Sequence, residues 1–497
     1  MKEEKNKEIK VPVVVVLGHV DHGKSTLLEA IRKEIRIVAR ESGGITQHIG
    51  AYEIEKDGKK ITFIDTPGHE AFKEMRSRGA EVADVAILVV DAGESVKPQT
   101  KESIKAVKKA DIPLIVALNK MDKSQAQPDW VKGELKKEGI IVESLGGKVP
   151  AVEVSAKEGK GIEELLETIS LVAEIEELKV EKDVPAEGAI IESALDPRKG
   201  VIATLIPRKG TLKKGDIIAT PSVKGKVKQL IDFQGKQIEK CLPSQPAALL
   251  GFEEAPEVGQ QFKVFGSLES AEEFFQGGEK KEGISEKKDQ KEKTLKIILK
   301  ADVKGSLEAL KSVLKELSHE EVELDIIKSE VGNINAGDIK LANDLGARIF
   351  GFRVKMEKNI ENTASQLKVF PKTFDVIYEL VDEIKQSMER MLSPEIKRID
   401  LGKIKILALF KKSKKGQIIG GRVVEGEITK DTLAEVYRNK EKIGQGKIKS
   451  MEEEKRTISS AGKGKEVGML FIPEEDIDIK EDDILHVYKK EKVDKTL

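Results

Sequence analysis

The chain is 497 residues long, with 39% hydrophobic and 35% charged residues and a formal net charge of −1. This length exceeds what one hydrophobic core serves and predicts roughly three to five domains, while the balanced charge gives no sign of non-specific DNA binding. The single cysteine, Cys241, excludes an internal disulfide and a cysteine-based zinc site. No apolar run approaches the roughly 20 residues that span a bilayer, and the Lys/Glu-rich start lacks the apolar segment of a secretory signal. We therefore expect a cytoplasmic, monomeric protein that contacts neither membrane nor DNA.

The first third of the chain has the pattern of an α/β domain. Residues 1–10 are charged and are expected to be disordered. Val11–Leu17 is a continuous β-branched run, typical of a strand that is buried on both faces of a parallel sheet. Similar runs return at 60–64, 85–90, 113–118 and 149–154, with helical patterns between them. This alternation predicts a doubly wound α/β domain over residues 11–180.

The pattern changes after residue 183. Short alternating strands, separated by Lys-Gly and Gly-Asp turns, predict a β-barrel domain over residues 184–267. Residues 276–293 consist almost entirely of Gly, Glu, Lys, Asp, Gln and Ser. Such a composition cannot bury a core, so residues 268–293 are predicted to form a flexible linker.

The remaining residues predict one more α/β domain and a second barrel. Strands and helices alternate over residues 294–371, as in a compact α/β sandwich. Residues 372–393 carry apolar side chains at spacings of three and four, which predicts one long connecting helix of about 30 Å. Residues 394–490 return to turn-rich strands and predict a C-terminal β-barrel. The expected fold class is therefore multidomain α/β and β.

A glycine-rich segment follows the first predicted strand directly and opens a helix. Its spacing is that of a P-loop, although an ordinary glycine turn is the alternative. Glycines let successive backbone N–H groups face phosphate oxygens, and the helix N-terminus adds partial positive charge. We expect Lys24 to bridge the β- and γ-phosphates of a nucleotide and Ser25 to hold Mg²⁺. The predicted phosphate-binding residues are Gly18, His19, Val20, Asp21, His22, Gly23, Lys24, Ser25 and Thr26.

Two further loops are candidates for the metal and the γ-phosphate. Asp65 ends a predicted strand, where its carboxylate can reach magnesium through water, and the Gly68 N–H can meet the γ-phosphate. Thr46 lies beside two adjacent glycines and is placed to complete the magnesium shell only when a γ-phosphate is present. A plain turn at residues 65–68 and a flexible loop around Thr46 are the alternatives.

The segment after the apolar strand Leu114–Leu118 selects the base. The Asp122 carboxylate can accept hydrogen bonds from guanine N1–H and its 2-amino group. Adenine leaves a buried acceptor unpaired, at a cost of roughly 1–3 kcal/mol. These features predict GTP or GDP as ligand, and the predicted base-binding residues are Asn119, Lys120, Asp122, Ser155, Ala156 and Lys157.

His69 is the candidate catalytic residue. It follows the γ-phosphate glycine, where a Ras-type GTPase has a glutamine, and is placed to orient the attacking water. A surface or capping histidine is the alternative. No internal arginine finger is obvious from the sequence, so we expect slow hydrolysis until an external partner organises His69.

Several longer strings resemble known families. Gly18–Thr26, the histidine after Pro67-Gly68, and Asp91–Thr100 resemble the translational GTPases. Strings in the predicted barrel, the second α/β domain and the long helix resemble the bacterial translation initiation factor 2 family, namely Glu192–Asp196, Gly210–Asp216, Pro243–Pro246, Lys300–Ser306 and Met391–Pro394. The resemblance covers about residues 11–490 and implies a ribosome-dependent GTPase. The resemblance also implies that the GTP form of such a protein holds formylmethionyl initiator tRNA on the small ribosomal subunit and promotes joining of the large subunit. The extended N-terminal region of the family is expected to be absent.

The predicted C-terminal barrel departs from the family pattern where tRNA is expected to bind. The usual Glu-Cys-Gly is Glu466-Val467-Gly468, and three carboxylates at 452–454 stand where cations are expected and would repel phosphate. The resemblance still implies a tRNA-binding set of Arg438, Lys447, Glu466, Val467 and Gly468, with solvated barrel residues as the alternative.

Two other functions are compatible with these motifs. One is a different ribosome-dependent GTPase, of elongation or specialised type, although the α/β unit at 294–354 argues against it. The other is a ribosome-binding protein whose nucleotide site is structural. Intact Lys24, Asp65, His69 and Asp122 argue against that alternative.

Overall fold

The computed structural model describes most of the chain, in two compact units, Met1–Ser387 and Met388–Leu497. Residues described are 7–34, 50–56, 58–68, 70–274, 293–317, 321–356, 360–392, 395–413, 416–454, 456–475 and 477–493. Within these ranges, no helix is both long and apolar enough to cross a membrane. Most of the predicted linker, residues 275–292, lies outside the described ranges.

The first unit begins with a six-stranded sheet in the order β3-β4-β2-β5-β6-β7. Only β3 is antiparallel, to β4; the other neighbours pair in parallel. All six residues of β2 are buried, as its continuous β-branched run predicts. The strands are β2 Val13–Gly18, β3 Gly50–Lys56, β4 Lys59–Asp65, β5 Val85–Asp91, β6 Leu114–Asn119 and β7 Ala151–Glu153.

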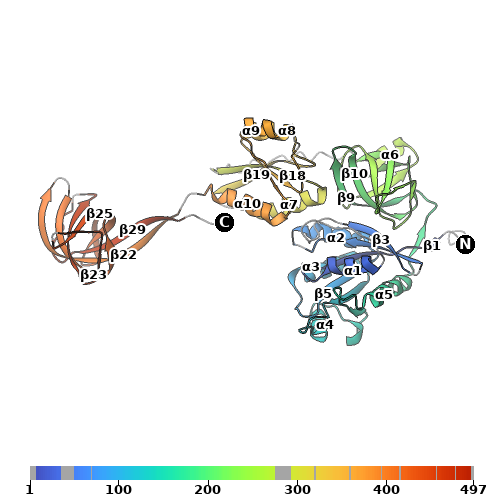
Figure 1. The fold of residues 1–497 in the computed structure, drawn as a ribbon, viewed down its shortest axis with the longest axis horizontal. Coiled ribbons are helices and arrows are strands. Elements are labelled where there is room, and N and C mark those ends of the chain that lie inside the picture. The colour runs from blue at the N-terminus through green and yellow to red at the C-terminus, as the bar shows by residue number, and fades with distance from the viewer. Residues whose placement is uncertain are drawn as a thin grey trace. The chain divides into compact units, whose positions relative to one another are not determined.

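Helices cover both faces of this sheet, which makes the domain doubly wound (Figure 1). Leu27 of α1 and Leu165 of α5 share one core with Val14 and Val16 of β2. On the other face, Gly79 of α2 lies against Val15. The helices are α1 Lys24–Glu34, α2 Lys73–Val82, α3 Pro98–Ala110, α4 Pro128–Lys137 and α5 Ile162–Ile175, with short 3-10 turns η1 Glu70–Phe72 and η2 Glu143–Leu145.

A closed antiparallel barrel follows. β12 pairs with both β17 and β13, which closes the order β12-β17-β9-β10-β16-β13 into a ring. The ring strands are β9 Glu187–Asp196, β10 Gly200–Lys209, β12 Ile217–Ala219, β13 Lys224–Asp232, β16 Ala247–Phe252 and β17 Gln261–Phe265. Short pairs join β1 Lys7–Ile9 with β8 Lys179–Glu181, β11 Leu212–Lys213 with β15 Lys240–Cys241, and β14 Gln237–Ile238 with β13.

Two boundary predictions are wrong at their edges. Residues 7–9 were expected to be disordered but form β1, because their backbone pairs with β8. Residues 268–274 were assigned to a linker but form helix α6, Leu268–Phe274. Ala271 is fully buried there and Glu272 pairs with Lys224 of the barrel at 2.7 Å, so this helix belongs to the barrel.

The first unit ends with a second α/β module, a four-stranded parallel sheet in the order β19-β18-β20-β21. Its core joins Ile298 and Ile349 of the sheet to Ile339 of α8. The elements are β18 Lys293–Ala301, α7 Lys304–Glu316, β19 Val322–Val331, α8 Ala336–Leu345, β20 Arg348–Phe352, α9 Glu361–Gln366, β21 Lys372–Phe374 and α10 Ile377–Glu389.

The predicted long connecting helix over 372–393 is too long. Residues 372–374 form β21, whose Phe374 is in register with Phe352 of β20, and the helix α10 begins only at Ile377. Its 13 residues span about 20 Å at 1.5 Å per residue. Ser387 accepts a hydrogen bond from Arg348 at 2.8 Å, so α10 packs on the α/β module.

The second unit is another closed antiparallel barrel. β22 pairs with β29 and with β23, which closes the order β22-β29-β24-β25-β28-β23. If the six ring strands of each barrel are numbered 1 to 6 along the chain, both barrels have the circular order 1-6-3-4-5-2. The strands are β22 Glu395–Ser413, β23 Gly416–Thr429, β24 Thr432–Arg438, β25 Glu441–Glu453, β26 Arg456–Ile458, β27 Ser460–Gly462, β28 Glu466–Pro473 and β29 Ile484–Val493.

Candidate functional site

The predicted nucleotide loops meet at one edge of the first sheet. β2, β4, β6 and β7 are parallel, so the loops that follow them emerge at their common carboxyl ends. In open α/β sheets this edge is where ligands bind. The phosphate loop lies between β2 and α1, with the N-terminus of α1 at its end.

The phosphate loop takes its shape from two glycines. Gly18 has φ +142° and Gly23 has φ +86°, a region that side chains disfavour. A Cβ at Gly18 would lie 2.3 Å from the Val89 carbonyl oxygen, and one at Gly23 would lie 2.4 Å from Nδ2 of Asn119. The loop is therefore packed tightly against β5 and against the base-selecting segment. Ser25 and Thr26 lie in the first turn of α1.

Lys24 is buried at the centre of the site, with 5% of its surface exposed. Its Nζ donates to the carbonyl oxygen of His19 at 2.6 Å. Burial lowers the pKa of Lys24 to about 8, although the nearby Asp65 carboxylate opposes this shift. A Cβ on Gly68 would lie 2.2 Å from Nζ of Lys24. The loop that carries Asp65 and Gly68 thus abuts Lys24 of the phosphate loop.

Two side chains hold the 65–68 loop in place. Oγ1 of Thr66 donates to the Val16 carbonyl oxygen at 2.8 Å, which ties the loop to β2. Nη1 of Arg76, on α2, donates to the Pro67 carbonyl oxygen at 3.2 Å. Nη2 of the same arginine pairs with Oε2 of Glu102 on α3 at 2.7 Å. Arg76 was not among the residues predicted from the sequence. In the structure it lies on the buried face of α2, with Met75 and Gly79.

Asn119 joins three loops. It is fully buried at the end of β6. Its Nδ2 donates to the His22 carbonyl oxygen at 2.9 Å, and its Oδ1 accepts from the Ala156 N–H at 3.1 Å. The backbone N–H of Ala156, one of the predicted base-binding residues, is therefore engaged by Asn119 in this structure. Asn119 fixes the distance between the phosphate loop and the 155–157 loop.

Asp122 lies opposite the 155–157 loop. Its Oδ1 accepts from Oγ of Ser155 at 2.7 Å, and this hydrogen bond is the main reason that the pKa of Asp122 is lowered. The group is solvent-exposed and ionised at neutral pH. Ser155 thus orients one carboxylate oxygen and leaves the other for a ligand. Lys157 follows in the same loop.

Lys120 adopts a left-handed backbone conformation, with φ +66°. Its Nζ lies 2.9 Å from Oδ2 of Asp91, a buried carboxylate that also pairs with Lys123 at 3.0 Å. The Asp91 carboxylate thereby holds the lysine stem along the base-binding segment. Asp91 is the last residue of β5, at the edge of the sheet where the nucleotide loops meet. Its place directly after the predicted strand 85–90 is the feature of the sequence that points to it.

Both histidines of the phosphate loop have lowered pKa values. His22 is 1% exposed, and burial lowers its pKa to about 4. Burial also lowers the pKa of His19, whose ring lies 5.1 Å from that of His22. The Val20 N–H of the same loop donates to Oε1 of Gln99 on α3 at 3.0 Å. Thr46 and the candidate catalytic His69 lie outside the described residues.

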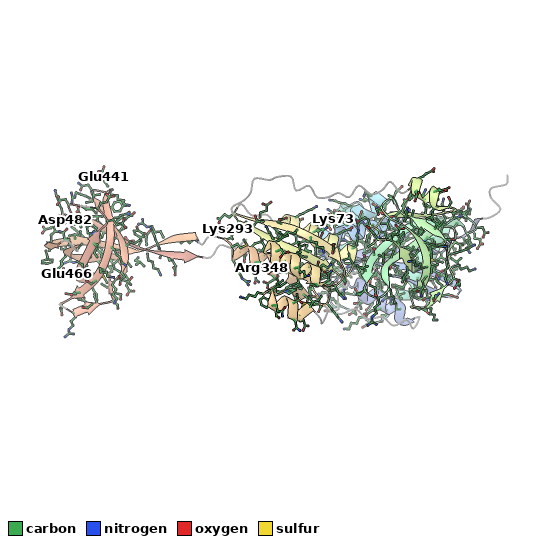
Figure 2. The ribbon with its side chains drawn as sticks, turned by 90° about the horizontal axis from the view of Figure 1, so that it is seen from above. Lys73, Lys293, Arg348, Glu441, Glu466 and Asp482 are labelled. Atoms are coloured by element: carbon green, nitrogen blue, oxygen red, sulfur yellow. The ribbon has the colours of Figure 1, made fainter. Side chains whose placement is uncertain are left out.

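The predicted tRNA-binding residues lie on three strands of the second barrel, and Figure 2 labels Glu466 among them. Arg438 holds both oxygens of Asp483, at 2.8 and 2.9 Å, and Lys447 lies 3.3 Å from Asp431. Glu466 pairs with Arg422 at 2.5 Å. Val467 is 2% exposed and packs in the barrel core, and Gly468 is in register with Gly420. The three charged side chains therefore already have partners within the barrel.

Known proteins match this chain along its length. The family models Elongation factor Tu GTP binding domain, Elongation factor G domain 2 and Translation-initiation factor 2 match residues 9–174, 185–265 and 271–385. Translation initiation factor IF-2 of Carboxydothermus hydrogenoformans is 43% identical, over 99% of this chain and 61% of its own length. The same factor of Halothermothrix orenii is 43% identical, over 99% of this chain and 73% of its own length. GDP-bound aIF5B from Aeropyrum pernix, a crystal structure, is 26% identical with a TM-score of 0.48, covering 97% of this chain and 92% of that one.

The phosphate loop, the 65–68 loop and the Asn119–Asp122 segment, gathered at one edge of a parallel sheet, define a P-loop nucleotide-binding domain built like that of elongation factor Tu. Two barrels and a second α/β module follow it. With 43% identity over 73% of the Halothermothrix protein, the chain belongs to the translation initiation factor IF-2 family. It spans 61% and 50% of the lengths of two other curated relatives.

Proposed function

We propose that this chain binds GTP and hydrolyses it to GDP and phosphate. The observation that carries this proposal is the base-selecting corner, where Ser155 orients the ionised Asp122 and Asn119 locks the corner to the phosphate loop. A fixed carboxylate accepts from guanine N1–H and the 2-amino group, and it repels the N1 lone pair of adenine. The selectivity for guanine follows from that fixed acceptor.

Magnesium fits the oxygen donors of the site. Asp65 is 8% exposed and its charge acts on Lys24, which places a buried carboxylate beside the phosphate loop. The Ser25 hydroxyl and this carboxylate are the hard oxygen ligands that Mg²⁺ prefers. When bound, the ion supplies charge neutralisation at the β- and γ-phosphates. The third ligand, Thr46, and the orientation of water by His69 stay predictions.

We propose further that the protein acts in translation initiation, in the cytoplasm. Membership of the IF-2 family supports a GTP form that stabilises formylmethionyl initiator tRNA on the small ribosomal subunit and promotes subunit joining, with hydrolysis on the assembled ribosome. For the tRNA contact we keep the predicted set around Arg438 and Glu466. Because these side chains pair with Asp483 and Arg422, tRNA binding would have to exchange those ion pairs for new ones.

Calorimetric titration of the full chain with GTP, GDP and ATP in the presence of magnesium tests the nucleotide proposal. We expect both guanine nucleotides to bind and ATP to bind more weakly by about tenfold or more, since adenine turns a lone pair and no donor toward the Asp122 carboxylate. Lys24→Ala should weaken both guanine nucleotides, whereas the exposed control Lys73→Ala should not. Equal affinity for ATP and GTP would refute the proposed specificity.

The translation role needs two further measurements. GTP turnover should rise on addition of 70S ribosomes, and His69→Ala should abolish that rise while leaving nucleotide affinity unchanged. Formylated initiator tRNA should compete better than unformylated tRNA for the GTP-bound protein. Turnover that ribosomes do not stimulate would instead indicate a binding protein whose nucleotide site is structural.

A further inference from the structure

Arg76 is a buried cation beside the proposed γ-phosphate site. It is only 1% exposed, on the helix α2 that follows the 65–68 loop. A buried charge costs several kcal/mol unless it is paired and hydrogen-bonded. Its partners are Glu102, on α3, and the Pro67 carbonyl oxygen. Arg76 thus connects the loop to a second helix.

The hydrogen bond to Pro67 also determines where Gly68 points. The Pro67 carbonyl and the Gly68 N–H belong to one planar trans peptide unit, so they point in opposite directions. Arg76 holds the carbonyl side at 3.2 Å. On Gly68 itself, a Cβ would lie 2.2 Å from Nζ of Lys24 and 3.1 Å from the Val20 nitrogen. The peptide whose plane Arg76 holds therefore borders the phosphate loop.

We propose that Arg76 is a positioning residue for the γ-phosphate, which acts by holding the peptide between Pro67 and Gly68 so that the Gly68 N–H is available to GTP and not needed by GDP. Glu102 orients the guanidinium group, and its carboxylate offsets the cost of burying it. The inference rests on the proposed GTP-binding function and deepens it.

A buried arginine that only supports the fold makes a different prediction. Its loss would loosen α2 and α3 and would weaken every ligand of the domain equally. The ratio of the affinities for GTP and GDP separates the two cases, because only a γ-phosphate role changes that ratio.

The experiment measures the dissociation constants of a fluorescent GDP and a fluorescent, non-hydrolysable GTP analogue for the full chain and its variants. We expect Arg76→Met to weaken the GTP analogue by about tenfold, as for loss of one hydrogen bond that involves a charged group. The affinity for GDP should change by less than about twofold. Arg76→Lys should restore little, because a lysine cannot hold Pro67 and Glu102 at once.

Two more variants complete the test. Arg78→Met removes the same group from the same helix, but Arg78 pairs with Glu308 of α7, so the affinity ratio should stay as in the unaltered protein. If Arg76→Met does not fold, Glu102→Gln keeps Arg76 and removes its orienting carboxylate, and it should lower the ratio in the same direction. Equal losses for both nucleotides, or no change, would overturn the inference alone. Failure of the unaltered protein to bind either nucleotide would overturn the proposed function as well.

Discussion

The charged amine of Lys24 is buried before any nucleotide binds, and this burial is unfavourable. Burial lowers the pKa of this lysine to about 8. Phosphate groups beside the amine favour its charged form and raise the pKa. Between the two pKa values the complex holds one more proton than the free protein. The contribution of Lys24 to GTP affinity should therefore be constant below about pH 8 and should fall as pH rises above it.

Titration calorimetry in two buffers of different ionisation enthalpy measures that proton directly. Up to one proton should be taken up per nucleotide at about pH 9, and much less at about pH 7.5, where Lys24 is charged in both states. The same protein at the lower pH is the control. No uptake at the higher pH would show that the amine keeps its proton in the empty site.

Asp122→Asn should change the base that the protein prefers. The amide keeps an oxygen for Ser155 but presents N–H donors where the carboxylate accepted. The 2-amino group of guanine then no longer faces an acceptor on the protein. Xanthine has a carbonyl in place of that amino group, and this carbonyl can accept from the new amide N–H. GTP affinity should fall by about tenfold or more, and xanthosine triphosphate should bind more tightly than to the unaltered protein.

The control for that exchange is Asp129→Asn. Asp129 is 95% exposed at the start of α4 and bonds only to the neighbouring Lys132 among the contacts seen in the described residues. Competition binding with the two triphosphates should leave its preference unchanged. If Asp122→Asn also kept its preference for GTP, the base would have to be selected elsewhere.

The sequence was sufficient to locate those pocket residues that directly follow a recognisable strand. Lys24, Asp65, Asn119 and Asp122 each follow a strand of recognisable composition, and the structure brings their loops to one edge. Arg76 was missed because its partners, Pro67 and Glu102, lie 9 and 26 positions away. A pattern in local spacing carries no information on such contacts.

At the scale of single elements, helix α8 has a capping box at its start. The Asn335 side chain accepts from the Asp338 N–H at 3.1 Å, and the Asp338 carboxylate accepts from the Asn335 N–H at 3.0 Å. Asp338 is also buried against Lys300 and Lys328. Asn335→Ala should therefore lower the free energy of unfolding by about 1 kcal/mol, the usual cost of losing an N-cap.

Denaturant unfolding, followed by circular dichroism, checks this value. Asn343→Ala is the matched control, since Asn343 is the same residue type in the same helix but is exposed near its end. It should change stability by less than about 0.5 kcal/mol. An equal effect of the two substitutions would mean that the capping box adds nothing beyond helix propensity.

Helix α10 shows where periodicity alone is insufficient. Apolar side chains at spacings of three and four continue back to Phe374, so the pattern predicted one helix from residue 372. Phe374 instead completes the edge of the sheet beside Phe352. Pairing with an existing strand satisfies backbone groups that a helix end would leave open. Tertiary contacts decided between two local conformations that the apolar pattern does not distinguish.

On the scale of the whole molecule, the two barrels share a circular strand order although their sequences are only faintly alike. Gly215-Asp216 and Gly225–Lys228 in the first barrel resemble Glu427 and Gly446–Lys449 in the second too weakly to predict a repeat. The structure shows that both barrels close in the same way, through double pairing of β12 in one and of β22 in the other. Closure pairs the backbone of every ring strand on both sides and so removes exposed strand edges. Because this depends on backbone groups, sequences that differ widely can form the same closed barrel.

The two units have separate cores, and this predicts how the protein unfolds. Within the described residues, the core of the second barrel draws only on residues 404–487, and the cores of the nucleotide domain, first barrel and α/β module draw only on the first unit.

A ligand that binds only the folded first unit stabilises that unit by about 2.7 kcal/mol when the ligand is present at 100 times its dissociation constant. In differential scanning calorimetry, GDP with magnesium should therefore raise the transition temperature of the heat absorption from the first unit. The absorption from the second unit should stay at the same temperature. ATP at the same concentration should shift the absorption of the first unit clearly less than GDP does, and Lys24→Ala should reduce the shift by GDP. If GDP moved all of the absorption together, the nucleotide domain and the second barrel would have to unfold as one cooperative block, and the separate cores would not describe the stability of the chain.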